Sequence, residues 1–184
     1  MTNTTTWQID PAHSAVEFAV KHMMFTTVRG RFKDVTGTIE VDEQHPERST
    51  VNVEIAAASI DTGVADRDAH LRSADFLDVE KHPLITFRSK RVEGAKNDGS
   101  PFKLIGDLTI RGKSVEVALD SAWLGSGKDP WGNTKGGAEG TAKIDRRDWG
   151  LTWNQALETG GILVANDIRI EIQVQAVKAV AVAA

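Results

Sequence analysis

The segment Ile168-Arg169-Ile170-Glu171-Ile172-Gln173-Val174 decides the fold class of this 184-residue chain. Apolar residues stand at every second position, and Arg169, Glu171 and Gln173 fill the places between them. A period of two is typical of a β-strand with one buried and one solvated face, because successive side chains point to opposite faces of a sheet. The segment therefore predicts an antiparallel strand along an apolar core.

The same alternation recurs along most of the chain. Its apolar positions are Val16, Phe18 and Val20; Ile39 and Val41; Val51, Val53 and Ile55; Ile85 and Phe87; Phe102 and Leu104; Leu108 and Ile110; and Val115, Val117, Leu119 and Trp123. Turn signals such as Asn97-Asp98-Gly99 and Gly160-Gly161 separate these runs. We therefore predict an all-β (mainly β) protein. Periodicity leaves both a sandwich and an up-and-down barrel open. The barrel is favoured because few strands are apolar on both faces, so one curved sheet can close around a single interior.

One stretch departs from strand periodicity. Residues 62–79 place Val64, Leu71 and Ala74 near helical spacing, and Thr62 suits the N-cap position. We expect a short helical excursion there, made of one or two helices.

Domain organisation follows from the absence of any repeat or linker that would divide the chain. We predict a single domain at 7–177, a flexible N-terminal tail at 1–6 and a C-terminal tail at 178–184. The first ten residues resemble no secretory leader, so we expect a cytoplasmic protein, or a periplasmic one if a leader had been removed. No apolar run approaches the length of a spanning helix, so the protein is not expected to cross a membrane.

Charge and composition exclude several classes of function. Lys and Arg number 22 and Asp and Glu 26, for a net charge of −4, which argues against a nucleic-acid partner. With no cysteine, the chain has no disulfide, no thiol nucleophile and no cysteine-based metal site.

The remaining polar groups form no recognisable catalytic or metal motif. Asp66 and His70 share a face of the predicted helix, but a solvated face or a local hydrogen bond explains them as well. The pair Arg146-Arg147 is interpreted as a local ion-pair cluster rather than a nucleic-acid contact. We therefore predict no catalytic residue, no metal ligand and no cofactor.

Several short motifs stand out along the chain. They follow one another in order, and any one of them alone would be weak. They are Trp7-Gln8-Ile9-Asp10-Pro11-Ala12-His13-Ser14-Ala15-Val16-Glu17-Phe18, the strand-end His22, Val28-Arg29-Gly30-Arg31-Phe32, Ala58-Ser59-Ile60-Asp61-Thr62, His70-Leu71-Arg72-Ser73-Ala74-Asp75-Phe76-Leu77-Asp78, Pro83-Leu84-Ile85-Thr86-Phe87-Arg88-Ser89, Gly106-Asp107-Leu108-Thr109-Ile110-Arg111-Gly112 and Arg147-Asp148-Trp149-Gly150-Leu151. Together these motifs resemble those of the YceI-like family of lipocalin-like, polyisoprenoid-binding proteins. The last motif departs from that family at Trp149, where Phe is usual.

The resemblance implies a lipocalin-like, extended, eight-stranded antiparallel β-barrel with a helical segment beside it. It further implies that a long isoprenoid or fatty chain occupies the pore, often in a homodimer. We therefore expect a protein that binds an isoprenoid quinone, a polyprenyl compound or a fatty-acyl compound for carriage, storage or sequestration, as a homodimer and without a cofactor. Two alternatives stay open. One is a filled barrel that acts as a dimerisation or interaction module. The other is an enzyme acting on a lipid-linked substrate through Asp66, His70 or His22.

The apolar parity of the strands supplies the candidate ligand site. We expect the pore to be lined by Val16, Phe18, Val20, Phe32, Phe87, Leu104, Leu108, Trp123 and Ile170. Met23, Met24 and Phe25 are expected to guard an opening, since methionine suits a surface that meets a variable apolar ligand. His22 is either a hydrogen-bond partner of the ligand's polar head or a satisfied histidine at the barrel end.

Overall fold

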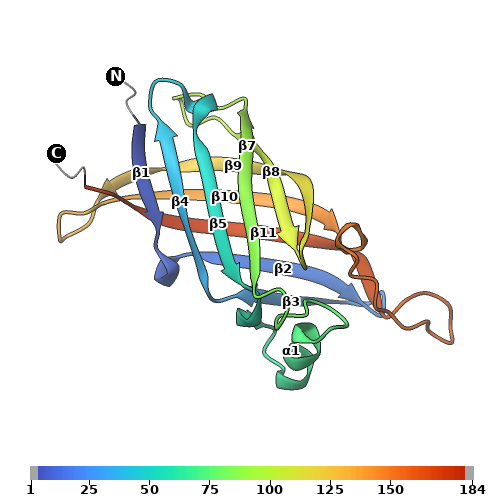
Figure 1. Cartoon of the computed structure of the whole chain (residues 1–184). Coiled ribbons are helices and arrows are strands. Elements are labelled where there is room, and N and C mark those ends of the chain that lie inside the picture. Colours follow the sequence, from blue (N-terminus) through green and yellow to red (C-terminus); the bar gives the residue numbers. More distant parts are fainter. Residues whose placement is uncertain (1–3, 181–184) are drawn as a thin grey trace.

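The structure, a computed structural model, describes residues 4–180 as one β-sheet that closes on itself, with one α-helix beside it (Figure 1). The strands are β1 (Thr4–Ile9), β2 (Ala15–His22), β3 (Thr26–Phe32), β4 (Val35–Asp42), β5 (Thr50–Ala56), β6 (Ile60–Asp61), β7 (Leu84–Glu93), β8 (Phe102–Ile110), β9 (Lys113–Lys128), β10 (Thr134–Asp145) and β11 (Val164–Lys178). The helix is α1 (Ala65–Arg72), and four short 3-10 helices are η1 (Pro11–His13), η2 (Pro46–Arg48), η3 (Ala57–Ser59) and η4 (Arg146–Trp149).

Pairing between the first and last strands closes the barrel. The strands follow the order β1-β4-β5-β7-β8-β9-β10-β11, and β1 pairs antiparallel with β11 through Trp7↔Lys178 and Ile9↔Ala176. Every pairing in this ring is antiparallel. The predicted eight-stranded antiparallel barrel with a short helix beside it is therefore confirmed. Closure leaves no free edge within the ring, which protects the sheet from pairing with other chains.

A break in the first barrel strand explains why the sheet holds more strands than the ring. β1 and β2 take successive parts of the same edge of β11, with Ile9↔Ala176 in one part and Phe18↔Ile170 in the other. Between them, Pro11 begins η1, and the Asp10 carboxylate accepts a hydrogen bond from the Ala12 amide. Proline has no amide to donate to the ladder, so the strand is interrupted there.

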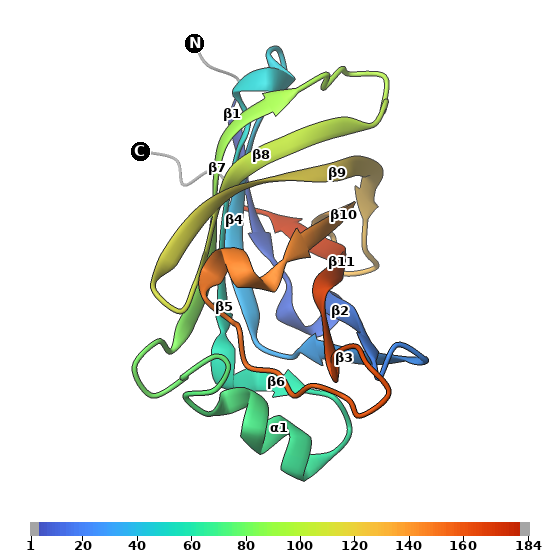
Figure 2. The same cartoon turned by 90° about the vertical axis from the view of Figure 1, so that its right-hand side faces the viewer.

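The helical excursion lies across one end of the barrel, below the other elements in Figure 2. It contains α1, whose N-cap is Val64 and not the predicted Thr62. The hydroxyl of Thr62 instead donates to the buried carboxylate of Asp68, which also accepts the Thr62 amide at 2.9 Å. The predicted cap is therefore wrong by two residues, and the threonine ties the helix to the strand before it.

The predicted domain boundaries need correction at both ends. Thr4–Thr6 belong to β1 and are not a tail, since Thr5 pairs with Val41 of β4. Lys178 is the last residue of β11. Residues 1–3 and 181–184 lie outside the described residues. Among residues 4–180, no helix is long and apolar enough to span a membrane.

Candidate functional site

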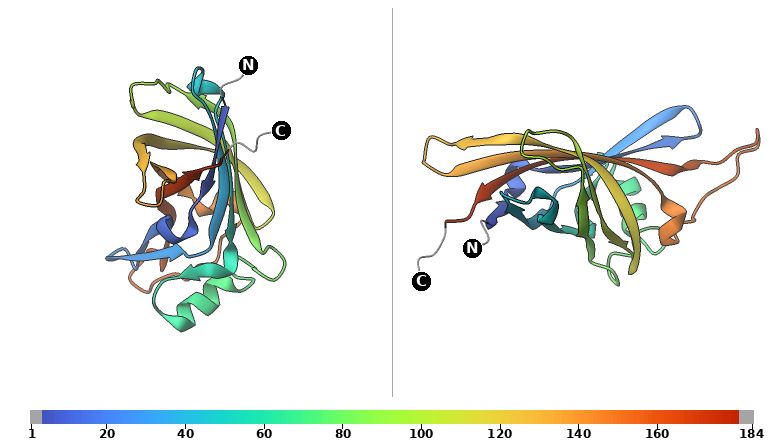
Figure 3. Two further views of the ribbon diagram at one scale, coloured as in Figure 1. Left: turned by 90° about the vertical axis from the view of Figure 1, so that its left-hand side faces the viewer. Right: turned by 90° about the horizontal axis from the view of Figure 1, so that it is seen from above.

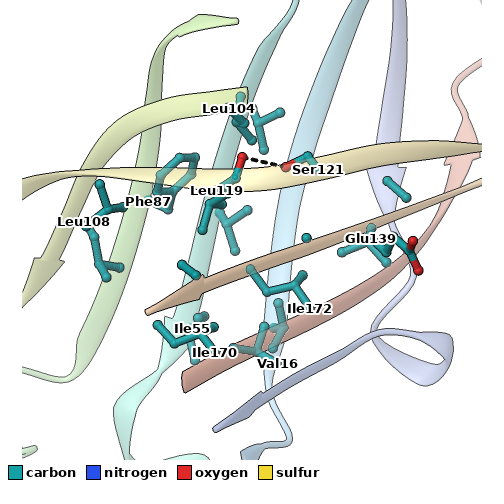
Figure 4. Close-up of a pocket in the computed structure, with 18 of the residues that line it drawn as sticks. Val16, Ile55, Phe87, Leu104, Leu108, Leu119, Ser121, Glu139, Ile170 and Ile172 are labelled. Carbon is teal, nitrogen blue, oxygen red and sulfur yellow. Dashed lines mark hydrogen bonds between the residues drawn. The ribbon is translucent and has the colours of Figure 1, made fainter. Parts of the chain in front are cut away.

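The barrel encloses an elongated cavity of about 550 Å³. Its wall is made almost entirely of aliphatic and aromatic side chains, as the close-up in Figure 4 shows for Val16, Ile55, Phe87, Leu104 and Ile172. Cavities of roughly 300–1,000 Å³ are the usual size of small-molecule sites. The chain thus encloses a lipophilic space instead of filling its barrel with side chains.

Strand alternation builds this wall. Ile168, Ile170, Ile172 and Val174 of β11 all line the cavity, and Arg169 lies on the outer face between them. From Val164 to Val174 the strand spans about 33 Å at ~3.3 Å per residue. The cavity wall therefore has the proportions needed to accommodate an extended chain.

All nine residues predicted from apolar parity lie in the cavity wall: Val16, Phe18, Val20, Phe32, Phe87, Leu104, Leu108, Trp123 and Ile170. They come from strands far apart in sequence. Phe18 pairs with Ile170 across β2 and β11, and Phe87 pairs with Leu108 across β7 and β8. That these side chains contact a ligand stays a prediction.

The three residues predicted to guard an opening, and His22 next to them in sequence, lie elsewhere. His22, Met23, Met24 and Phe25 are absent from the cavity wall and form the turn between β2 and β3, where the side chains of Met24 and Phe25 are 67% and 79% exposed. His22 pairs with Val164 at the end of the β2–β11 ladder. The alternation of inward and outward side chains along β2 therefore ends at this residue. The predictions of a guarded opening and of a histidine holding the ligand's head are therefore wrong.

One end of the cavity is sealed by residues that strand parity did not identify. Leu71 of α1, Phe76 and Leu77 of the segment after it, and Trp149 of η4 all line this end. Phe76, Leu77 and Trp149 are buried, and the indole Nε1 of Trp149 donates to the Leu108 carbonyl at 2.9 Å. The excursion thus acts as a floor. The resemblance had singled out Phe76 and Trp149 only as family motifs.

Arg146 is a structural cation at this floor. The predicted ion-pair cluster is correct only for Arg147, which pairs with Asp145. The buried guanidinium of Arg146 donates to the carbonyls of Leu151, Trp153, Val164 and Ala165 at 2.7–3.3 Å. Burial lowers the pKa of Arg146 from its ordinary value. The arginine therefore ties the segment after η4 to the start of β11.

The opposite end of the cavity reaches the surface between two loops. Asp42, Glu43 and Ser49 around η2 and Lys96 and Asn97 between β7 and β8 line this mouth, and Glu43, Lys96 and Asn97 are exposed. The Asn97 amide donates to the Glu43 carbonyl at 3.2 Å and so links the two loops. Backbone hydrogen bonds from His45 and Gln44 lower the pKa of Asp42. A polar mouth and an apolar floor give the cavity a direction.

The acid–base candidates are not brought together. His70 lies 2.8 Å from Asp75, not from Asp66, and its ring packs edge-on against Trp153 with centroids 4.6 Å apart. Neither His70 nor Asp66 lines the cavity. Within residues 4–180, no group of three or more His, Asp or Glu is close enough to hold a metal ion.

Asp145 should make the barrel floor sensitive to acid. Hydrogen bonds from the side chain and amide of Arg147 lower the pKa of Asp145 from 3.8 to about 2. A native pKa below the unfolded one contributes stability that is present above about pH 4 and is lost as the pH falls towards 2. The free energy of unfolding of the wild type minus that of Asp145→Asn should be constant above that window and shrink through it. A difference independent of pH would contradict this assignment.

Comparisons with known proteins agree with this geometry. A family model described as the YceI-like domain matches residues 7–176. A UPF0312 protein of Pectobacterium atrosepticum is 44% identical over 142 residues, which cover 76% of this chain and 71% of the relative.

Solved structures share the fold. The Campylobacter jejuni YceI protein is 32% identical with a TM-score of 0.73, covering 87% of this chain and 90% of that one. A polyisoprenoid-binding domain from Saccharophagus degradans has a TM-score of 0.66 at 12% identity, covering 94% and 98% of the two chains.

Proposed function

This chain belongs to the YceI-like family, and on that premise we propose that its barrel binds the apolar chain of an isoprenoid or related lipid. The ligand is a quinone, a polyprenyl compound or a fatty-acyl compound, held for carriage, storage or sequestration. Its tail runs into the cavity towards Phe76 and Trp149, and its polar head stays at the mouth beside Lys96 and Asn97. The protein acts as a binding protein and not as an enzyme.

The observation that carries the proposal is a cavity of about 550 Å³ whose wall is mostly apolar and which reaches the surface at a polar mouth. Each methylene moved from water into such a space contributes about 0.8 kcal/mol before ordering costs. A long tail can therefore bind usefully without a strong polar contact, and a wall already formed by strands keeps the ordering cost low.

Two further observations support this choice over its alternatives. The Saccharophagus degradans domain, whose fold this chain shares, is described as polyisoprenoid-binding. A filled barrel would lack the cavity, and an enzyme built on Asp66, His70 or His22 would need those groups in the cavity wall, where none of them lies. The homodimer, the cytoplasmic location and the absence of a cofactor stay predictions.

The proposal predicts that the protein is purified with its ligand. Native mass spectrometry of freshly purified protein should show a bound species, and solvent extraction should identify it as an isoprenoid or acyl compound in stoichiometric amount. Protein stripped of lipid should regain the ligand when incubated with quinones or fatty acids. A protein mass that stays free of ligand after that incubation would overturn the proposal in favour of an interaction module.

A matched pair of variants tests whether the lipid occupies the cavity. Ala142 lines the cavity on β10, and its neighbour Thr141 is exposed on the outer face. Ala142→Phe should occupy the space of the lipid tail and reduce the affinity for the lipid roughly tenfold or more. This is the effect of losing two or three buried methylenes. Thr141→Phe adds the same ring outside and should leave the affinity unchanged. Equal loss in both variants would place the lipid outside the barrel.

A further inference from the structure

The turn between β2 and β3 has a backbone conformation that its residues disfavour. The Phe25 amide donates to the His22 carbonyl at 3.1 Å, and the two central residues, Met23 and Met24, have φ of 51° and 63°. Positive φ at both central positions defines a type I′ turn, which strongly prefers Asn-Gly. Methionine there is strained, and strained backbone positions of this kind cluster at functional sites.

What the strained turn achieves is the display of apolar side chains. Met23, Met24 and Phe25 are 40%, 67% and 79% exposed, and Phe25 and Met24 are among the most exposed large apolar residues of residues 4–180. The Met23 amide donates to the Leu163 carbonyl at 2.8 Å, which holds the turn against the segment before β11. We call residues 22–25 the β2–β3 tip. It projects from the side of the barrel, away from the mouth loops (Figures 1 and 3).

Cations without counter-ions flank this tip on the outer face. Arg29 and Arg169 both pair with Ala19, one from β3 and one from β11, and Lys21 lies two residues closer to the tip. Within residues 4–180, none of these three cations has a hydrogen bond or an ion pair. The carboxylates of Glu17 and Glu171 lie one row further away. In a chain with a net charge of −4, this is a local surplus of positive charge.

We propose that the β2–β3 tip docks on the surface of an anionic lipid bilayer. Met24 and Phe25 enter the boundary between head groups and acyl chains, and Lys21, Arg29 and Arg169 face the anionic head groups. Apolar side chains beside free cations are the combination that holds proteins at such interfaces. A second copy of the chain fits less well, because a two-fold contact brings the same cations against each other.

Vesicle flotation tests the proposal with the full chain stripped of bound lipid. The wild type should float with vesicles of phosphatidylcholine and phosphatidylglycerol and bind phosphatidylcholine alone much more weakly. Salt should weaken the binding, since exposed charges are screened. In the variant Met23→Asn, Met24→Gly, Phe25→Thr the turn gains its preferred residues. Its Tm should therefore rise by a few degrees, while vesicle affinity falls roughly tenfold or more. Loss of binding in this variant cannot come from unfolding.

Two further variants complete the design. Arg29→Glu should lower affinity for the anionic vesicles about fivefold or more, the effect of one interfacial cation. Trp131, 83% exposed at the β9–β10 turn, is the control, and Trp131→Thr should leave vesicle binding unchanged. Unchanged binding in the triple variant, or equal binding to both vesicle types, overturns the proposal. The proposal is also overturned if the triple variant changes the oligomeric mass but not vesicle binding, because the tip would then be a contact between copies of the chain. None of the substituted residues lines the cavity, so the differences between these variants and the wild type do not report on binding in the cavity.

Discussion

Leu108→Asp should abolish lipid binding and is expected to lower the Tm sharply. Leu108 lies on β8 in the cavity wall, paired with Phe87 on one side and Val115 on the other. Its carbonyl accepts the Trp149 indole, so the residue also borders the floor. A carboxylate facing this space finds no partner, and leaving a charge unpaired in an apolar interior costs several kcal/mol. Extractable lipid per protein and thermal unfolding measure the two effects.

Glu116→Lys is the matched control, because Glu116 lies on the opposite face of the neighbouring strand. Its carboxylate lies 3.3 Å from the Lys90 ammonium and 3.2 Å from the Arg91 guanidinium, at the surface. Exposed ion pairs contribute about 0–1 kcal/mol, so the charge reversal should leave both the fold and the lipid content intact. Leu108→Met nearly conserves the volume of the side chain and should retain lipid. It therefore shows whether the loss in Leu108→Asp comes from the charge or from replacing Leu108 at all. Equal lipid retention in Leu108→Asp and Glu116→Lys would show that β8 faces the cavity with its other side.

The cavity wall could be predicted because one physical rule governs it. In a strand that separates water from an apolar interior, every second side chain is buried and therefore apolar. The alternation alone thus shows that Ile168, Ile170 and Ile172 face the interior. The rule needs no knowledge of which strands are neighbours. It therefore identified wall residues on β2, β7 and β11 alike.

The ends of the barrel could not be predicted in this way. Parity holds only while a strand continues, and at His22 the chain turns instead of extending into the barrel. Turn preferences did not predict a turn at this position, because Met23-Met24 is an unfavourable pair for the turn that it forms. The floor depends on contacts between distant segments, such as Trp149 with Leu108, which no local pattern encodes. At the N-terminus, Thr4–Thr6 carry no apolar alternation, and they are ordered by pairing with β4.

Gly106→Ala should destabilise the barrel strongly, although it adds only one methyl group. Gly106 lies on β8 between the wall residues Leu104 and Leu108. A Cβ at this position would lie 2.4 Å from the Arg88 carbonyl oxygen and 2.7 Å from the Phe87 ring. The Phe87 ring could rotate away, but the Arg88 oxygen belongs to the paired strand and cannot. Overpacking of this kind costs about 3 kcal/mol, and a shift of roughly 6–12 °C in Tm follows for a chain of this size.

The control is a glycine in the same sheet with free space around it. Gly127 lies on β9, and a Cβ there would meet no atom within 4 Å. Gly127→Ala should leave the Tm unchanged or raise it slightly, because alanine restricts the unfolded chain more than glycine does. Chemical denaturation of both variants measures the difference directly. If Gly106→Ala were as stable as Gly127→Ala, β7 and β8 would have to separate locally at almost no energetic cost. In that case a wall of paired strands would not keep the cavity open without its ligand, and the low ordering cost on which tail binding depends would be lost.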